Sequence, residues 1–331
     1  MYIVIVNYNN SKDTIECLES VLKNTNDNYQ IIVVDNSENN KSYDEIVNWS
    51  KNEISNIETN FNYIIYPLVK KPVDLVLLNE ENILNENIKN KILLVKAKHN
   101  KGFSAANNIA LKYILKFDKK NSLIWLLNND TIIEKNTINS ILEEVTKLND
   151  KDKIFFGTPL IDYNNPELIQ ATGGKYNYIT GNSIIVDVNK PLLNYKFNPN
   201  IKVDFPIGAS MLVTTNNLLS TGLLCEDYFL YFEELDWSFR MRKNNGYVKI
   251  INVLSVYHKQ GNSTNTKNVG KNSDFIDLVY LKAKMKFATK FNKYRLIVWV
   301  YTLTFAIFKR LLQGEFKRVI SIFNILIKKS Y

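Results

Sequence analysis

The chain has 331 residues, of which 45% are hydrophobic and 23% are charged, a composition typical of a globular protein and not of a disordered one. The net charge of +9 does not indicate a nucleic-acid-binding body, because residues 282–331 hold twelve Lys or Arg and a single acidic residue, Glu315. The two cysteines, Cys17 and Cys225, are far apart and lack metal-ligand spacing, which favours a reducing compartment without a disulfide framework.

Short apolar runs alternate with amphipathic helical segments in the first half of the chain, and this alternation predicts a mostly parallel sheet. Residues 50–91 are Asn-rich and weakly patterned, and we interpret them as an insertion with strand-like runs at 63–66 and 73–78. The predicted strands are Tyr2–Val6, Gln30–Val34, Ile92–Lys96 and Leu123–Leu127; the predicted helices begin with Ser11 as N-cap, run over 103–117, and follow Asn136.

Polar residues directly follow each of these strands. Ligands of open α/β sheets bind beyond the carboxyl ends of the strands, so we expect these residues to line one edge of the sheet. They are Asn7-Tyr8-Asn9, Asp35-Asn36-Ser37, His99-Asn100-Lys101-Gly102 and Asn128-Asn129-Asp130.

The alternation of helices and strands ends after Asp150. Glycines at 173, 174 and 181 and the run Ser183–Val188 predict hairpins, which we interpret as an acceptor-side lobe added to a nucleotide-binding half. Further along, we predict a strand after Phe205–Met211, a helix opened by residues 226–237 and ending near Gly246, and a last strand, Val248–Tyr257, that delivers His258.

Asp130 follows a buried strand, where a carboxylate can hold a divalent cation together with water and phosphate oxygens. An Asn-rich turn would explain the same residues without any metal. His258, at the end of the last predicted strand, is a reasonable additional ligand, although a single His is more often a hydrogen-bonded surface residue.

Three acidic residues, Glu233, Glu234 and Asp236, stand at a predicted helix start, where the helix dipole alone favours carboxylates. Capping does not explain the density of aromatic residues around them. A partly dry aromatic wall can raise the pKa of a carboxylate towards that of a useful base and can stack on sugar rings. The residues of this wall are Tyr228, Phe229, Tyr231, Phe232 and Trp237.

Taken together, these segments resemble the inverting family 2 glycosyltransferases over about residues 1–265, most closely the bacterial rhamnosyltransferase-like branch that builds surface polysaccharides. The motifs, in order, are VIVNYN, IIVVDNS, NKGFSAANN, LLNNDT, FPIGASMLV, EDYFLYFEELDWSFRMRKNNGY and YHKQGNS. The resemblance implies a GT-A fold, an α/β architecture whose mostly parallel central sheet is flanked by helices. It also implies transfer of a sugar from a nucleotide-diphosphate donor to a hydroxyl of a growing glycan. Asp35 fits uracil or thymine equally, so UDP- and dTDP-sugars both stay open, and a lipid-diphosphate-linked acceptor would suit the basic tail.

The resemblance further implies roles for single residues. Glu234 matches the catalytic base, with Glu233 as the alternate base, and Asp130 and His258 match positions that bind the divalent cation, Mn²⁺ or Mg²⁺. Two residues depart from the family pattern, since Asn128 replaces the first acid of the DxD motif and Glu234 replaces Asp. The nucleotide site is assigned Val6, Tyr8, Asp35, Asn36, Asn100, Gly102, Asn107, Asn128 and Asn129, and the sugar and acceptor are assigned Gly208, Ala209, Asp227 and, from the aromatic wall, Trp237.

Two other functions remain open. A sugar nucleotidyltransferase should carry a Gly-rich basic phosphate loop after its first strand, where this chain has Asn7-Tyr8-Asn9-Asn10. A catalytically silent glycan-binding protein is supported by the missing DxD acid.

The basic tail contains an apolar run of 13 residues, Leu296–Phe308, which is shorter than the ~20 residues needed to cross a bilayer. The next segment is expected to place Phe316, Val319, Ile320, Phe323 and Ile327 on one helix face, as in helices that lie on an anionic membrane surface. The alternative is a helical pair that packs on the body or on a second copy in a homodimer. Nucleic acid is not an expected partner, because an apolar face would not contact phosphates.

These patterns predict a catalytic domain at 1–270, with a nucleotide-binding half at 1–150 and an acceptor half at 151–270, followed by a membrane-associated tail at 271–331. The chain opens directly on a strand-like YIVIVNY without a basic segment before it, so no secretory signal is expected. We therefore expect a cytoplasmic protein, peripheral on the inner face of the cell membrane.

Overall fold

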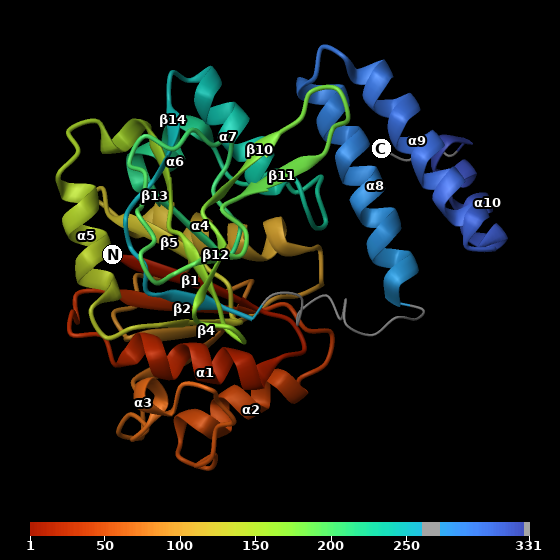
Figure 1. Cartoon of the computed structure of the whole chain (residues 1–331). Coiled ribbons are helices and arrows are strands. Elements are labelled where there is room, and N and C mark those ends of the chain that lie inside the picture. The colour runs from red at the N-terminus through yellow and green to blue at the C-terminus, as the bar shows by residue number, and fades with distance from the viewer. Residues whose placement is uncertain (260–271, 328–331) are drawn as a thin grey trace.

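The structure, a computed structural model, describes residues 1–259 and 272–327. Within these residues, a central eight-stranded sheet is flanked by helices, and three further helices, α8, α9 and α10, lie together at one side (Figure 1). The helices are α1 (Ser11–Leu22), α2 (Lys41–Ser50), α3 (Asn62–Ile65), α4 (Phe103–Phe117), α5 (Thr137–Thr146), α6 (Thr215–Thr221), α7 (Glu233–Lys243), α8 (Asn272–Phe291), α9 (Arg295–Leu312) and α10 (Phe316–Ile327), with a short 3₁₀ helix at Lys151–Lys153.

The central sheet has the strand order β14-β7-β13-β5-β1-β2-β4-β3. From β5 to β3 neighbouring strands are parallel, whereas β13 runs antiparallel to both β5 and β7. The parallel strands therefore end at one common edge, as predicted. The bounds are β1 (Tyr2–Asn7), β2 (Gln30–Asp35), β3 (Leu75–Asn79), β4 (Ile92–Lys96), β5 (Leu123–Leu127), β7 (Ile154–Gly157), β13 (Ser210–Thr214) and β14 (Tyr247–Ile250).

A second sheet of five strands has the order β12-β9-β8-β15-β6, and a separate hairpin pairs β10 with β11 antiparallel. This hairpin confirms the prediction made from the glycines at 173, 174 and 181. The bounds are β6 (Thr131–Ile133), β8 (Leu160–Asp162), β9 (Leu168–Ala171), β12 (Lys190–Pro191), β15 (Val256–His258), β10 (Gly173–Tyr176) and β11 (Ser183–Val186).

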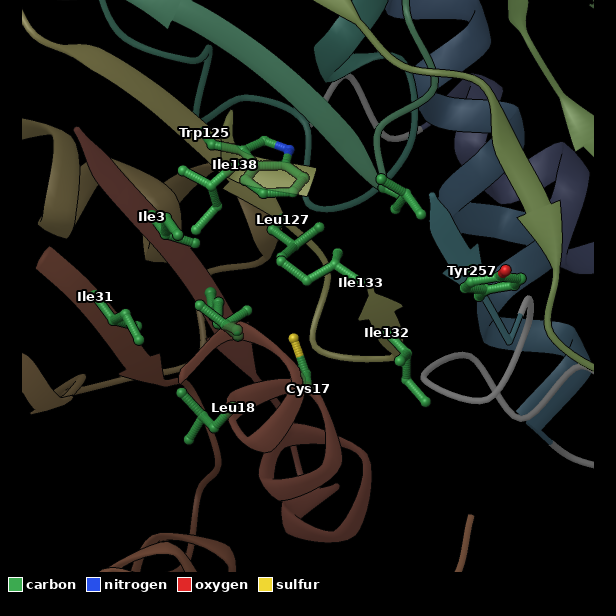
Figure 2. Packing of buried hydrophobic residues seen from close by; sticks show 14 of the residues in the cluster. Ile3, Cys17, Leu18, Ile31, Trp125, Leu127, Ile132, Ile133, Ile138 and Tyr257 are labelled. Carbon is green, nitrogen blue, oxygen red and sulfur yellow. The ribbon is translucent and has the colours of Figure 1, made fainter. Parts of the chain in front are cut away.

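The sheet is covered on both faces. Figure 2 shows Cys17 and Leu18 of α1 facing Ile3, Ile31 and Trp125, which come from three adjacent strands. A second cluster packs α4 and Trp237 against the opposite face. Each fully buried aliphatic side chain contributes roughly 1.5–3 kcal/mol, so the two clusters fix the strand ends on which the site depends.

Three local predictions were wrong. The N-cap of α1 is Asn10, whose side chain accepts a hydrogen bond from the Asp13 amide. Residues 63–66 are not a strand, because hydrogen bonds to Phe61 and Asn62 carbonyls close a helical turn that buries two isoleucines. The predicted strand 248–257 is divided into β14 and β15, which belong to different sheets; by contrast, the run at 73–78 does form the edge strand β3.

The basic tail packs on the body through α8. Ala283 and Phe287 of α8 are buried in an aromatic cluster with Phe232 and Leu235, which lie at the start of α7. α9 packs in turn on α8 and α10, burying Val298, Thr302, Ala306 and Arg310 along one stripe. None of the helices in the described ranges is both long enough and apolar enough to cross a membrane.

Candidate functional site

Asp130 and His258, remote in sequence, are brought into contact by strand pairing. β6 and β15 are antiparallel and align Thr131 with His258, so the residue before β6 lies beside the end of β15. The Oδ1 atom of Asp130 is 3.2 Å from Nε2 of His258. Both side chains are buried, and the predicted pairing of these two residues is present in the fold.

The Asp130 carboxylate is ionised and incompletely satisfied. Burial alone would disfavour the charge, but the attraction of His258 and neighbouring donors outweighs burial and holds the pKa of Asp130 below its ordinary value. Oδ1 is nevertheless a buried oxygen without a well-formed hydrogen bond in the structure, and its near neighbour is His258 Nε2 at 3.2 Å. A buried charged oxygen in this condition is costly unless a cation joins it.

These two side chains fit a partial metal site. Adjacent ligands of an octahedral ion with bonds of about 2.1 Å lie about 3 Å apart, close to the 3.2 Å observed between Oδ1 and Nε2. No group of three or more His, Cys, Asp or Glu able to hold a metal occurs among residues 1–259 and 272–327. The remaining ligands of such an ion would therefore be phosphate oxygens and water.

The loop that carries Asp130 is held from two directions. The Asn128 amide donates to the Ala209 carbonyl at 3.0 Å, and the Thr131 hydroxyl donates to the Asn128 carbonyl at 2.7 Å. Asn129 is buried and donates its side-chain amide to Thr14 of α1 at 2.9 Å. Asn129 therefore anchors the loop to α1 in the structure, and its predicted contact with the nucleotide stays a prediction.

Asp35, predicted to read the nucleotide base, is fully buried. Its Oδ1 accepts hydrogen bonds from Asn7 and Ser37 at 2.7 and 2.6 Å, and its Oδ2 pairs with Lys96 at 2.7 Å. The carboxylate thus ties together the ends of β1, β2 and β4. Beside it, Val6 is half-buried and Tyr8 is 38% exposed, which leaves the Tyr8 ring as the accessible predicted base contact.

Asn36, Asn100 and Gly102 form a connected group beyond β2 and β4. The Asn100 side-chain oxygen accepts from the Asn36 amide at 2.8 Å and from the Gly102 backbone amide at 3.0 Å. Asn107, by contrast, is buried in α4 and donates to the Phe103 carbonyl at 2.9 Å, and its predicted contact with the donor stays a prediction.

Gly102 is required by a backbone contact. Its φ of +93° lies in the left-handed region, and a Cβ there would be 2.2 Å from the Phe229 carbonyl oxygen. The next amide, that of Phe103, donates to the same oxygen at 2.9 Å. Gly102, predicted to lie at the diphosphate, therefore also lets the segment 226–237 pack directly on the carboxyl edge of the sheet.

That segment leads into the paired glutamates at the start of α7. Tyr231 and Phe232 adopt φ values of +70° and +68°, a costly backbone for aromatic residues, immediately before Glu233. Glu233 is 6% exposed, with an Oε2 that has no hydrogen-bond partner in the structure, and Glu234 is half-buried.

Burial raises the pKa of both glutamates. The pKa of Glu233 lies well above its ordinary value because of burial and then the charge of Glu234, and burial raises the pKa of Glu234 to about 7. Since ionisation of either carboxyl disfavours ionisation of the other, the two glutamates titrate as a pair. One glutamate of such a pair can accept a proton at pH 7.

The other predicted acceptor-side residues divide into two groups. Trp237 stabilises the fold: its side chain is fully buried, packs edge-on against Phe155, and donates to the Gly222 carbonyl at 2.9 Å, which leaves its predicted acceptor contact without an exposed surface in the structure. Asp236 is likewise structural, since it forms ion pairs with Arg240 and with Lys290 of α8.

Gly208 and Asp227 remain accessible to an acceptor or sugar. A Cβ built on Gly208 meets no atom within 4 Å, so this glycine faces open space, whereas the adjacent Ala209 is buried. Asp227 is exposed and lies 3.3 Å from Lys286 of α8.

Two residues at the site were missed by the sequence analysis. Gln170 forms hydrogen bonds with His258 through both polar atoms of its side-chain amide. Lys259 forms buried ion pairs with Asp13 and Glu16 of α1. Lys259 follows the histidine directly and could have been noticed by its place, but no local pattern marks Gln170.

Comparisons with known proteins agree with this architecture. Residues 2–65 match the family model described as glycosyl transferase family 2, and no curated protein sequence matches the chain. A structure of GalNAc-T7 with UDP, GalNAc and Mn²⁺ is similar at 14% identity and a TM-score of 0.52, covering 87% of this chain and 50% of that one. A mannosyltransferase from Pyrobaculum calidifontis in complex with GDP-Man and Mn²⁺ is similar at 8% identity and a TM-score of 0.50, covering 100% of this chain and 75% of that one.

This chain spans only half of the length of the GalNAc-T7 chain. The likeness establishes the fold: a GT-A glycosyltransferase fold with a family 2 match over its N-terminal strands and helices.

Proposed function

We propose that this chain is an inverting glycosyltransferase that moves a sugar from a nucleotide-diphosphate donor onto a hydroxyl group of a glycan or lipid-linked acceptor. The contact between Asp130 and His258 at 3.2 Å, beside the strand ends where a GT-A fold binds its ligands, carries the proposal. The family 2 match over residues 2–65 supports the same activity. Both similar structures hold Mn²⁺ with a nucleotide or a nucleotide sugar, which supports a divalent cation and a nucleotide-sugar donor here.

In the proposed mechanism, Asp130 and His258 hold a divalent cation, which when bound offsets the charge that develops on the departing diphosphate. Glu234 accepts the proton of the acceptor hydroxyl, and Glu233 is the alternate base. The acceptor oxygen forms its bond to the anomeric carbon on the face opposite the departing phosphate oxygen, so the configuration inverts. Gly208, which faces open space, leaves room for the transferred sugar.

The nucleotide is proposed to stack on the exposed ring of Tyr8 beside Val6, with the group formed by Asn36 and Asn100 near the ribose. UDP- and dTDP-sugars both fit this assignment, and the resemblance to rhamnosyltransferase-like proteins of bacterial surface polysaccharide synthesis favours an acceptor of that kind. Because α8 is buried against α7, we place α8 with the catalytic lobe, so that the tail proper begins after Phe291.

A screen of nucleotide sugars by thermal shift tests the proposal. A true donor at 100 times its Kd stabilises the folded chain by about 2.7 kcal/mol, which raises the Tm by a few degrees. We expect a rise with UDP- or dTDP-sugars that is larger when MnCl₂ or MgCl₂ is present, together with slow hydrolysis of the donor. Binding without hydrolysis or transfer would favour a silent glycan-binding protein, and turnover of a nucleoside triphosphate with a sugar phosphate would favour a nucleotidyltransferase.

We further propose that the tail binds an anionic lipid surface through α9. The side of α9 opposite its buried stripe carries large apolar residues that are each more than half exposed, and exposed cations flank this α9 apolar face. The apolar residues are Leu296, Ile297, Val300, Phe305, Phe308 and Leu312, and the cations are Lys293, Arg295, Lys309 and Lys317. Apolar groups bordered by positive charge match the boundary between acyl chains and anionic headgroups.

The double substitution Val300→Glu and Phe308→Glu is expected to reduce co-sedimentation with phosphatidylglycerol-containing vesicles by more than tenfold, because each apolar side chain contributes roughly 1.5–3 kcal/mol on burial. Leu219→Glu, at an exposed leucine of α6, serves as the matched control and should bind as the wild type does. Binding by the wild type should also fall with added salt. A wild-type dimer that the double substitution converts to a monomer, with no vesicle binding by either form, would assign the α9 apolar face to a second copy instead.

A further inference from the structure

We propose that Gln170 is a positioning residue for His258: it decides which ring nitrogen carries the proton and so leaves Nε2 free to bind a cation beside Asp130. The inference rests on the proposed function, because it gives His258 the part of a metal ligand. It concerns a residue of the second sheet that lies 88 positions from the histidine in sequence.

Two hydrogen bonds fix the orientation of the Gln170 amide. Its Nε2 donates to the His258 backbone carbonyl at 3.0 Å, and a carbonyl can only accept. The other amide atom, Oε1, therefore faces Nδ1 of His258, at 2.6 Å. Because Oε1 can only accept, Nδ1 must carry a proton, and in the neutral imidazole the lone pair then belongs to Nε2.

A β-bulge gives Gln170 this position. In the pairing of β8 with β9, Leu160 lies opposite Ala171 and Ile161 lies opposite Ile169, so Gln170 is an extra residue with no partner on β8. Bulges re-aim side chains and are frequent beside functional sites. β8 separates β9 from β15, a distance of two strand spacings or about 10 Å, so only a long side chain can reach the histidine from there.

The arrangement has a consequence on the far side of the ring. With the proton on Nδ1, the Nε2 lone pair faces Asp130 Oδ1, which is itself an acceptor without a hydrogen-bond partner in the structure. Two acceptors 3.2 Å apart repel each other unless a positive charge lies between them: a second ring proton on Nε2 supplies it in the metal-free chain and gives the attraction that lowers the Asp130 pKa, and a metal cation can take the place of that proton. Histidines that bind metals nearly always donate their second N–H to a fixed partner, and removing that partner typically weakens metal binding 10- to 100-fold.

Mn²⁺ binding to the full chain tests the inference, with MnCl₂ and UDP as probes and free Mn²⁺ measured by electron paramagnetic resonance. Gln170→Leu, which can accept nothing from Nδ1–H, is expected to weaken Mn²⁺ binding about 10- to 100-fold. Gln170→Glu keeps an acceptor at Nδ1–H but loses the bond to the His258 carbonyl, and should bind Mn²⁺ within a few-fold of the wild type.

Gln30→Leu is the matched control, since Gln30 also donates its amide to two backbone carbonyls, at the start of β2, and should bind Mn²⁺ as the wild type does. Unchanged binding by Gln170→Leu would overturn the inference and leave the proposed function intact. Equal losses in the Leu and Glu variants would also overturn it, because the lost bond to the carbonyl would then be the cause. A wild type that binds no Mn²⁺ with UDP present would overturn both the inference and the metal-dependent mechanism.

Discussion

Replacing Glu234 with Gln is expected to lower the rate of sugar transfer about 10²- to 10⁴-fold while the affinity for the donor stays nearly unchanged. The amide has the size of the carboxyl group but cannot accept the acceptor's proton, and the donor does not depend on that step. Single-turnover transfer and equilibrium donor binding, measured on the same preparation, check the two halves of this expectation.

The pH dependence of the wild-type rate follows from the same residue. Burial raises the pKa of Glu234 to about 7, so the base is mostly protonated below pH 7 and the transfer rate should fall as the pH is lowered through that value. Glu143→Gln, at an exposed glutamate on α5, should retain both the rate and its pH dependence. If Glu233→Gln abolishes transfer and Glu234→Gln does not, the alternate base is the true one.

Asp130→Asn is expected to reduce metal-dependent transfer about 10²- to 10³-fold, the effect of removing one preorganised electrostatic partner from an active site. The substitution preserves the shape of a buried side chain but removes the ionised oxygen that faces His258. The Mn²⁺ concentration that gives half-maximal rate should rise in parallel, and a titration of the rate against MnCl₂ measures it.

Asn128→Asp offers the opposite test on the same loop. This half-buried residue occupies the first DxD position, and restoring the carboxylate should lower the Mn²⁺ requirement.

Transfer by Asp130→Asn at the wild-type rate, with the wild-type Mn²⁺ requirement, would remove Asp130 from the proposed mechanism.

The parts of the fold that repeat a local pattern could be predicted from the sequence. β4, β5 and α4 begin and end at the residues expected, because apolar periodicity and strand-end polar residues are local signals. Where a strand leaves one sheet for another, as between β14 and β15, the apolar run continues and only tertiary pairing reveals the break.

At the candidate site, the sequence indicated which residue types to expect but not always where their side chains point. Asp130 and His258 do contact each other, whereas the side chains of Trp237 and Asn107 are buried in the core. Gln170 could not have been found, because a bulge places it and nothing in the neighbouring residues announces that bulge. Gly102 was predicted to lie at the diphosphate, whereas the atoms closest to it in the structure belong to the Phe229 backbone.

α8 packs on α7, although the sequence analysis assigned α8 to a separate tail. This helix therefore forms part of the surroundings of the glutamate pair. Phe287 completes the aromatic cluster around Phe232, and Lys290 neutralises buried Asp236 two residues beyond Glu234. Exchanging the segment from α8 onward between related proteins would alter the surroundings of the acidic pair and the proposed lipid-binding face of α9 at the same time. Under the proposed roles of α9 and Glu234, a change in lipid docking and a change in proton abstraction would therefore accompany each other.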